Sequence, residues 1–400
     1  MAGSVGTCVE DVLKLMHLRH PFRTAAAVRT LLASHWNVRR CASRGERRFR
    51  NDSRYNLQYV TDGFASRIRD GNDDTALLVR ICQAYIAATE QDSFSTQAYG
   101  ATDWWQEVRQ SSLTPVRRAL ATHDTDALRA MYQNFFRDPC SAGLVGLPLA
   151  KVYFGSTIDD VYRHSFLSDA LHRIDYWQNQ TGNRFALREL AGPGLGNPFG
   201  VLIDGTLVCK GAEYQHYCAQ RIQELTSSAR ALIVEIGGGF GGMAYYLLRD
   251  NPQITYIDFD VPESLALISY YLLKSFPDLK FLLYGEEDMT QEAIARSNVI
   301  LMPSFQLSKV PTSSVDVTFS SHTMSDLSRP AQIVYLNEIE RMTRGSFLSI
   351  CEGEGSTLLD ELIATQSNSL RLTEERALRW NSHKVLRAKE MEFHYQIGAV

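Results

Sequence analysis

The first 136 residues carry apolar side chains at intervals of three and four positions. The spacing is clearest in TALLVRICQAYIAATE (75–90) and TDALRAMYQNFF (125–136), where it places the apolar side chains on one face of an α-helix. Strand-like alternation is sparse over the same stretch. The pattern predicts a mainly α-helical N-terminal domain over residues 1–137.

Residues 138–229 are interrupted by glycine and proline, which predicts a separate middle region. One helix is expected within it at SFLSDALHRIDYWQNQ (165–180). Two short strand-like runs flank the dipeptide Asp204-Gly205, which is a strong signal for a tight β-hairpin turn. A further helix is expected over residues 212–227, directly before the first strong strand.

From Ala231 onward, short apolar runs alternate with helical patterns. ALIVEIG, ITYIDFD, KFLLYG, VDVTFSS and SFLSICE are interpreted as strands, and helical segments separate most of them. Such alternation is typical of a parallel sheet with helices on both faces. The last two runs, LRLTEERALRW and EMEFHYQIGAV, are expected to form an antiparallel pair at the sheet edge. The pattern therefore predicts an α/β domain over residues 230–400.

The net charge of the chain indicates which kinds of partner it can bind. At −4 over 400 residues, the chain has no general attraction for nucleic acid. One local basic stretch, residues 39–50, holds six arginines and a single aromatic residue, Phe49. Without a known nucleic-acid-binding signature, this stretch is interpreted as a solvated face or an anion-contacting loop. A small molecule is the expected partner.

The cysteines and the apolar runs bear on the cellular setting. The seven cysteines are odd in number and never spaced as CxxC, so neither a disulfide scaffold nor a structural zinc site is expected, and no other metal is expected. No apolar run approaches the length of a membrane span, and the first residues lack the apolar core of a signal peptide. We therefore expect a cytoplasmic protein without a membrane partner.

The segment VEIGGGFGG follows a predicted strand and opens a predicted helix, which is the context in which a glycine string binds a ligand. Glycines allow a tight turn, and free N–H groups at the helix start face the polar groups of the ligand. Gly237, Gly239 and Gly242 match the dinucleotide fingerprint GxGxxG. An alternative match, to ExGxGxG, consists of Glu235, Gly237, Gly239 and Gly241. The carboxylate in this second pattern suits the ammonium group of S-adenosylmethionine (SAM) and would repel a pyrophosphate.

Further candidate residues stand where predicted strands end. Asp260 closes the second strand and, in preference to Asp258, is expected to accept hydrogen bonds from a ribose diol. After the third strand, Asp288 and Met289 are expected along the adenine of the cofactor, and the acids before them, Glu286 and Glu287, are expected to face the reacting groups. After the fourth strand, a predicted loop carries His322 and Asp326, which are candidates for catalysis.

Five blocks of the sequence occur in the order of a known family: GNPFGVLIDG, EYQHYCAQRI, EIGGGFGGMAYYLL, YIDFDVPESLALISYYLL and FPDLKFLLYGE. They resemble a bacterial family of sugar O-methyltransferases, within the class I SAM-dependent methyltransferases, over residues 138–350. The resemblance implies a Rossmann-like domain with a mostly parallel seven-stranded sheet and an antiparallel last strand. It also implies SAM as methyl donor, with S-adenosylhomocysteine as product. The chain has His322-Thr-Met-Ser-Asp326 where the family has a block like Ser-Leu-Ser-Glu-Met, so the acceptor does not carry over.

The helix that contains EYQHYCAQRI precedes the first strand of the sheet and is expected to fold over the cofactor. Tyr214 and Tyr217 are three residues apart and share a helix face. They are expected to stack on the cofactor, because a sulfonium is attracted to an aromatic face. The alternative is that both rings pack an amphipathic helix against the sheet.

Two kinds of methyl acceptor fit the candidate residues. A hydroxyl needs a general base, for which His322 and His216 are candidates. A guanidinium prefers paired carboxylates, and such carboxylates follow two strands: Glu286, Glu287, Glu352 and Glu354. The acidic groups favour N-methylation of a guanidino group, such as that of free L-arginine in a natural-product pathway, with Glu352 and Glu354 binding the substrate. O-methylation of a sugar hydroxyl, with His216 near the substrate, is the alternative.

Two other classes stay open on the sequence. The dinucleotide reading of the glycine string predicts an NAD-dependent oxidoreductase, and a SAM-binding protein without catalysis is a further alternative. The helical N-terminal half is expected either to cover the acceptor site or to form a homodimer.

Overall fold

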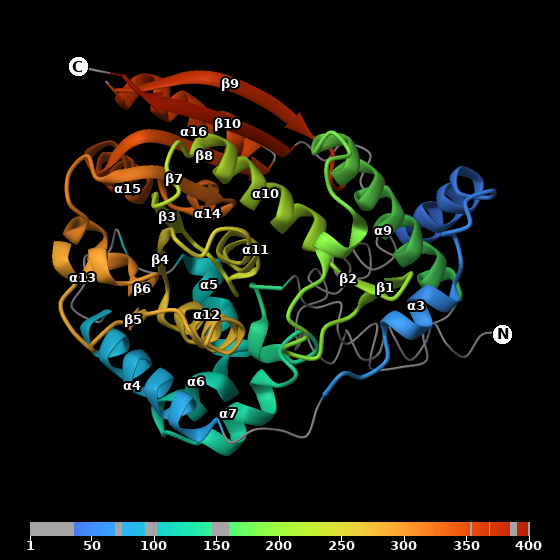
Figure 1. Ribbon diagram of the computed structural model, residues 1–400, viewed down its shortest axis with the longest axis horizontal. Coiled ribbons are helices and arrows are strands. Elements are labelled where there is room, and N and C mark those ends of the chain that lie inside the picture. Colours follow the sequence, from blue (N-terminus) through green and yellow to red (C-terminus); the bar gives the residue numbers. More distant parts are fainter. Residues whose placement is uncertain are drawn as a thin grey trace, which may run out of the picture.

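The computed structural model describes residues 36–68, 74–92, 99, 102–145, 160–352, 354–367, 369–384 and 390–398. An eight-stranded sheet lies at its centre, with helices on both faces (Figure 1). The order of the strands is β5-β6-β4-β3-β7-β8-β10-β9. This is the Rossmann-like α/β fold that the sequence predicts.

Six neighbouring strands of the sheet are parallel: β5 (Phe281–Leu283), β6 (Val299–Pro303), β4 (Thr255–Asp260), β3 (Leu232–Ile236), β7 (Val315–Ser321) and β8 (Thr343–Glu352). The last strand, β10 (Glu390–Ile397), lies antiparallel between β8 and β9 (Leu370–Leu378). The antiparallel pair at the sheet edge is confirmed. The sheet has eight strands instead of the predicted seven, because β6 is an additional strand that the sequence pattern did not reveal.

Helices cover the two faces of the sheet, and alternate residues of each strand point to opposite faces. Ile233 belongs to the hydrophobic cluster on one face and Val234 to the cluster on the other. Among the described helices, those that contribute buried side chains to the first cluster include α10 (Ala212–Leu225), α11 (Gly242–Asp250) and α12 (Pro262–Ser275). The second cluster includes side chains of α13 (Gln291–Arg296), α15 (Arg329–Met342) and α16 (Glu354–Gln366). The buried sheet explains why its parallel strands are nearly continuous apolar runs.

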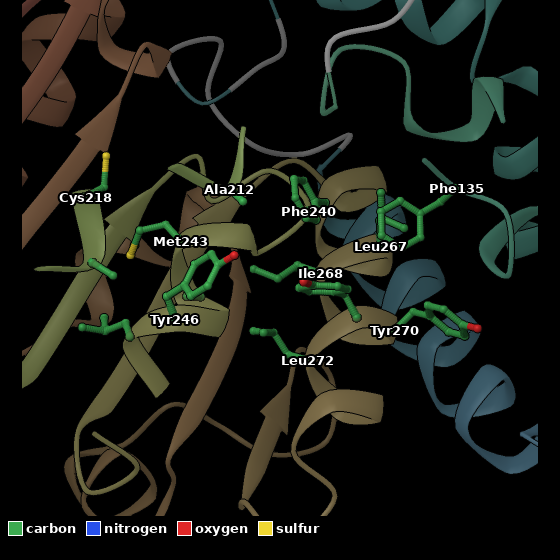
Figure 2. Close-up of a cluster of buried hydrophobic side chains, with 14 of the residues drawn as sticks. Phe135, Ala212, Cys218, Phe240, Met243, Tyr246, Leu267, Ile268, Tyr270 and Leu272 are labelled. Atoms are coloured by element: carbon green, nitrogen blue, oxygen red, sulfur yellow. The ribbon is translucent and has the colours of Figure 1, made fainter. Parts of the chain in front are cut away.

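The N-terminal part of the chain is helical, as predicted. It contains a helix over residues 36–48 and then α3 (Gln58–Gly63), α4 (Thr75–Asp92), α5 (Asp103–Ser111), α6 (Thr114–Ala121) and α7 (Thr125–Tyr132). Buried side chains of α3 to α7 join the first cluster of the sheet, so these helices and the sheet share one hydrophobic core. Figure 2 shows part of this shared core, where Phe135 lies near Leu267 and Phe240.

Ion pairs reinforce the contact between the N-terminal helices and α12. The Asp74 carboxylate lies 2.9 Å from Lys274 Nζ of α12 and 2.7 Å from Arg129 Nε of α7. Asp74 is buried, and Lys274 lowers its pKa together with Arg129, although burial acts in the opposite direction. The division into domains at residues 137 and 229 stays a prediction.

The middle region contains the elements that the sequence predicts. Helix α9 (Asp160–Gln180) precedes the hairpin of β1 (Gly200–Ile203) and β2 (Thr206–Cys209). Asp204 and Gly205 form the hairpin turn with positive φ values of 48° and 77°. The described part of the chain also contains three short 3-10 helices, η2 (Pro139–Ser141), η3 (Leu187–Leu190) and η4 (Ser304–Lys309). A short α-helix, α14 (Thr323–Asp326), follows β7.

The arginine-rich stretch contacts other parts of the chain. Arg48 donates to His172 Nδ1 at 3.0 Å and forms an ion pair with Asp175 at 3.2 Å. Arg44 donates to the carbonyl oxygen of His383 at 3.0 Å. These arginines therefore join the N-terminal helix to α9 and to the segment after β9.

The described cysteines are free thiols, and no helix in the described part of the chain combines the length and apolar content that a membrane span requires.

Candidate functional site

The glycine loop connects β3 to α11. Gly237, Gly239 and Gly241 have φ values of 84°, 62° and 88°, in the left-handed region that favours glycine. A Cβ at Gly237 would lie 1.9 Å from Thr323 Oγ1, so a side chain there would collide with α14. A Cβ at Gly239 would lie 4.0 Å from its nearest described neighbour, the carbonyl oxygen of Leu144. The loop therefore needs glycine at position 237 for packing, whereas position 239 faces open space.

Carboxylates of β4 hold the N–H groups of this loop. The Gly238 amide donates to Asp258 Oδ1 at 2.9 Å, and the Gly239 amide donates to Asp260 Oδ2 at 3.1 Å. Asp260 also accepts a hydrogen bond from the Val261 amide at 2.7 Å. Asp258 is fully buried, whereas Asp260 lines a cavity. Of the two acids, Asp260 is therefore the one that a ligand can reach.

Three carboxyl groups lie near one another at the ends of β3 and β4: those of Glu235 and Asp258, which are buried, and that of Asp260, which is partly exposed. Burial raises the pKa of Glu235 to about 8, and Asp260 adds to this effect, while a hydrogen bond from Tyr256 opposes it. Burial likewise raises the pKa of Asp260 to about 6. The pKa of Asp258 is raised well above its ordinary value, first by burial and then by the two other acids. A cation bound here would favour the ionised form of these carboxyl groups and lower their pKa values, whereas an anion would raise the pKa values further.

A cavity of about 490 Å³ opens at the carboxyl ends of β6, β4, β3 and β7. This is where ligands bind in doubly wound sheets, and the volume is that of a typical small-molecule site. Seven of the residues selected from the sequence line it: Tyr214, Glu235, Gly237, Gly239, Asp260, His322 and Asp326. They come from segments far apart in the sequence, and the sheet brings them together.

The end of β7 joins the cavity to α10. The hydroxyl groups of Tyr214 and Ser321 are hydrogen-bonded at 2.6 Å, and the Tyr214 ring lies 6.1 Å from the His322 ring between centroids. His322 has a φ of 66°, which is strained for a residue with a side chain. Its amide donates to the Ile350 carbonyl oxygen at 2.7 Å, which helps to hold this conformation. His322 therefore lines the cavity from a strained backbone position at the end of β7.

The N-terminal helical part supplies an aromatic wall of the same cavity. Trp104 and Trp105 of α5 line it, with their ring centroids 5.6 Å apart. Tyr99 lines it as well and packs edge to face against Tyr335 of α15, with the ring centroids 5.5 Å apart. The helical half therefore supplies part of the cavity wall, and its expected role in covering an acceptor site stays a prediction.

The charge of the cavity wall is one-sided. Among the described residues that line it, the acidic side chains are Glu235, Asp260 and Asp326, and none is a lysine or an arginine. An anionic ligand would therefore find no cationic side chain in this part of the wall.

The acids after β5 lie outside the cavity, contrary to expectation. β5 is a three-residue edge strand, and β6 separates it from β4, so the segment after β5 reaches the rim of the sheet. Glu286 accepts a hydrogen bond from Arg80 at 3.0 Å, and Glu287 pairs with Arg296. Two further residues of this segment were expected along the adenine: Asp288, which is exposed, and Met289, which is buried in the second hydrophobic cluster.

Two residues of α10 also lie outside the cavity. Tyr217 is buried on the side of β10, where its hydroxyl donates to Glu392 Oε2 at 2.6 Å. This bears out the packing alternative for Tyr217 and leaves only Tyr214 at the cavity. His216 is fully buried and accepts a hydrogen bond from Trp177 Nε1 at 3.2 Å, so it is not placed to act as a general base.

Three other candidates have different positions. Gly241 precedes α11 and shapes the loop without lining the cavity, and a Cβ there would lie 2.7 Å from Ile268 Cγ1. Glu352 ends β8 and Glu354 begins α16, but their side chains lie outside the described part of the structure.

Several lining residues carry no signal of this role in the sequence: Trp104, Trp105, Gln215 and Ser304. Ser304 follows β6, which appears in the sequence as the apolar run VILMP between polar residues. The tryptophans start a helix after a Thr102 cap, whose Oγ1 accepts from the Trp105 amide at 3.3 Å. Thr102 could have been used to predict where the helix begins, but it gives no sign that the tryptophans contact the cavity. Separately, no group of three or more metal-binding side chains occurs among the described residues.

Comparisons with solved structures show a similar fold at low sequence identity. No protein-family model and no curated protein matches the chain, so the resemblance to sugar O-methyltransferases is not confirmed. A SAM-dependent methyltransferase from Aquifex aeolicus is similar over 44% of this chain and 88% of its own, with 14% identity and a TM-score of 0.32. Geranyl diphosphate C-methyltransferase from Streptomyces coelicolor A3(2) is similar over 45% of this chain and 75% of its own, with 11% identity and a TM-score of 0.30. Scores this low carry no argument about the reaction, which must come from the residues of the cavity.

Proposed function

We propose that this protein is a SAM-dependent methyltransferase that acts on a small molecule. The observation that carries the proposal is the buried Glu235, which precedes a tight glycine loop in a cavity wall without a described lysine or arginine. SAM is a cation at its sulfonium and its ammonium, so it suits this wall. A pyrophosphate would face Glu235 and Asp260 with no described cationic side chain to compensate, which argues against NAD.

The residues of the loop fit a nucleoside with an amino-acid end. Asp260 closes β4 and offers carboxylate oxygens to ribose hydroxyl groups, and Glu235 offers a carboxylate to an ammonium. Tyr214 presents an aromatic ring at the same cavity, as cation-π attraction of a sulfonium requires. When bound, SAM supplies a methyl group that is already activated for transfer.

The chain then has to orient the acceptor and exclude water. The aromatic wall of Trp104, Trp105 and Tyr99 covers the cavity and serves both purposes. His322 is the candidate general base that takes the proton of an acceptor hydroxyl, since it lines the cavity at the end of β7.

The acceptor that this arrangement favours is a hydroxyl group of an uncharged, sugar-like molecule. A guanidino acceptor would need paired carboxylates at the cavity, but Glu286 and Glu287, two of the acids that favour it in the sequence, lie outside the cavity. His322 in the cavity is what O-methylation needs. Aromatic rings also pack well against the apolar faces of sugar rings.

N-methylation of a guanidino group is the second candidate, and one observation favours it. Asp326 lines the cavity, and the described wall has no cationic side chain, so a cationic acceptor such as L-arginine would be attracted. Either reaction, O-methylation or N-methylation, fits our proposal that the protein acts in natural-product biosynthesis.

A direct experiment separates these candidates. The purified protein is incubated with methyl-labelled SAM and with methyl β-D-glucopyranoside, methyl α-L-rhamnopyranoside, L-arginine or agmatine, and products are followed by mass spectrometry. Label in the glycosides supports O-methylation, and label in the guanidines alone supports N-methylation. A protein that does not bind SAM at all would overturn the proposal.

A further inference from the structure

Helix α5 brings two tryptophans to the cavity from the N-terminal part of the chain. Trp105 is buried, with 8% of its surface exposed, whereas Trp104 is 55% exposed although it lines the cavity. A large exposed ring on the wall of this cavity offers an apolar surface to a ligand. Gly143 lies so close to both rings that a Cβ there would approach Trp105 to 2.5 Å. Gly143, which also lines the cavity, therefore packs closely against both rings.

The same helix is held at its other end by a buried ion pair. Arg109 lies four residues after Trp105, so both side chains are on one face of α5. Its Nη2 donates to Glu263 Oε2 at 3.0 Å, and its Nε lies 2.9 Å from Oε1. Both side chains are buried. Burial makes this pair sensitive to the loss of either partner.

Glu263 belongs to the cofactor side of the cavity. It lies in the first turn of α12, three residues after Asp260, and its neighbours Val261 and Ser264 line the cavity. Arg109 therefore links the helix that carries the tryptophan wall to the segment that carries Asp260.

We infer that Arg109 is a positioning residue that sets the Trp104 and Trp105 wall relative to the cofactor segment, and that this wall selects acceptors with an apolar ring face. The inference rests on the proposed function in one respect, because it takes the cavity to hold both the methyl donor and the acceptor. Arg109 touches neither; it acts through the placement of α5.

The chain offers a matched control in Arg117. Its Nε lies 3.0 Å from the same Glu263 oxygen, but it belongs to α6, which carries no residue of the cavity wall. If the ion pairs only stabilise the fold, both replacements should lower the melting temperature without changing the acceptor KM, and Arg117→Gln should lower it less because the Arg117 side chain is more exposed. If Arg109 positions the wall, only its replacement should affect the acceptor.

The first measurement needs no acceptor. Hydrogen exchange of the amides of residues 102–111 is followed in full-length Arg109→Gln and Arg117→Gln proteins, with and without S-adenosylhomocysteine. We expect exchange in this segment to be faster by about tenfold in Arg109→Gln than in Arg117→Gln, because α5 loses its anchor. Equal exchange in the two variants would overturn the inference.

The second measurement uses the glycoside or guanidine that the wild-type protein methylates. Arg109→Gln should raise the acceptor KM by about tenfold with little change in kcat, Arg109→Lys should recover part of this loss, and Arg117→Gln should stay near wild type. Trp104→Ala should raise the KM for ring-shaped acceptors by a similar factor. Parallel changes in both arginine variants would assign Arg109 a structural role only. Calorimetry with S-adenosylhomocysteine in the same samples shows separately whether the proposed function itself fails.

Discussion

The hydroxyl of Tyr256 donates a hydrogen bond of 2.5 Å to Glu235 Oε2, directly before the glycine loop. The bond holds the Glu235 carboxyl in a buried position. Burial raises the pKa of Glu235 to about 8, although the hydrogen bond from Tyr256 acts in the opposite direction. The free protein therefore keeps much of Glu235 protonated near neutral pH. A cationic ligand must displace that proton to gain the full charge interaction.

The affinity for SAM should rise with pH between about 5 and 9. Asp260 and Glu235 have pKa values raised to about 6 and about 8, so Asp260 loses its proton in the lower part of this range and Glu235 in the upper part, and the cation binds the deprotonated forms more strongly. Calorimetry in buffers of different ionisation enthalpy should detect proton release on binding. Glu235→Gln should weaken binding and remove most of the pH dependence, and an unchanged pH profile in this variant would contradict the role of Glu235.

Gly239→Val should abolish SAM binding while the protein stays folded. The Cβ site at Gly239 faces open space, so a side chain there projects into the cavity instead of disturbing the core. Its φ of 62° adds strain of about 1 kcal/mol for a residue with a side chain.

Gly182→Val is a matched control for that strain. Gly182 has the same φ of 62°, its Cβ site has no described neighbour within 4 Å, and it does not line the cavity. The two variants should have similar melting temperatures, and only Gly239→Val should lose SAM binding in calorimetry. If both variants keep their affinity, the loop is not the cofactor site.

His322→Gln should lower kcat by a factor of about 100 or more if His322 removes the proton of a hydroxyl acceptor, because general bases contribute that much. The Kd for SAM should change little. Steady-state rates and calorimetry measure the two effects. A kcat that stays within a factor of about two would mean that another group takes the proton.

Glu287→Gln should leave methyl transfer unchanged. Glu287 pairs with Arg296 at the rim of the sheet, where both side chains are about half exposed, and such pairs contribute little to stability. Turnover of the methylated acceptor is the measurement. A clear loss of rate would place Glu287 in the reaction after all and would revive the paired-carboxylate site.

Relative to His216→Gln, the wild-type protein should lose stability as the pH falls from 6.5 toward 4. Burial lowers the pKa of His216 to about 4 in the folded chain, while the unfolded chain keeps the ordinary value, so acid favours the unfolded state through this group. The raised pKa values of Glu235, Asp258 and Asp260 act in the opposite direction in both proteins, so the difference between the two proteins isolates His216. Thermal unfolding monitored by circular dichroism measures this difference, and an identical pH dependence in the two proteins would remove His216 from the explanation.

The sequence predicts the fold well because the signals are local. Alternating strands and helices, the Asp204-Gly205 turn and the glycine loop are each visible within a few residues. β6 was missed because it is short and fully buried, and a five-residue apolar run does not by itself distinguish a strand from a buried part of a helix.

The candidate site was predicted best at the ends of strands. Glu235 lies near the end of β3, Asp260 ends β4 and His322 follows β7, all in the middle of the sheet, and all three line the cavity. The acids after β5 were misplaced because the position of a strand within the sheet, at an edge or in the middle, depends on long-range pairing. Trp104 lines the cavity through the docking of α5 on α12, which no local pattern reveals.

The most direct test of the central claim is calorimetric titration of the wild-type protein with SAM and, separately, with NADH. We expect SAM to bind at one site per chain and NADH not to bind, with SAM binding lost in Gly239→Val. Binding of NADH without binding of SAM would contradict the proposed function.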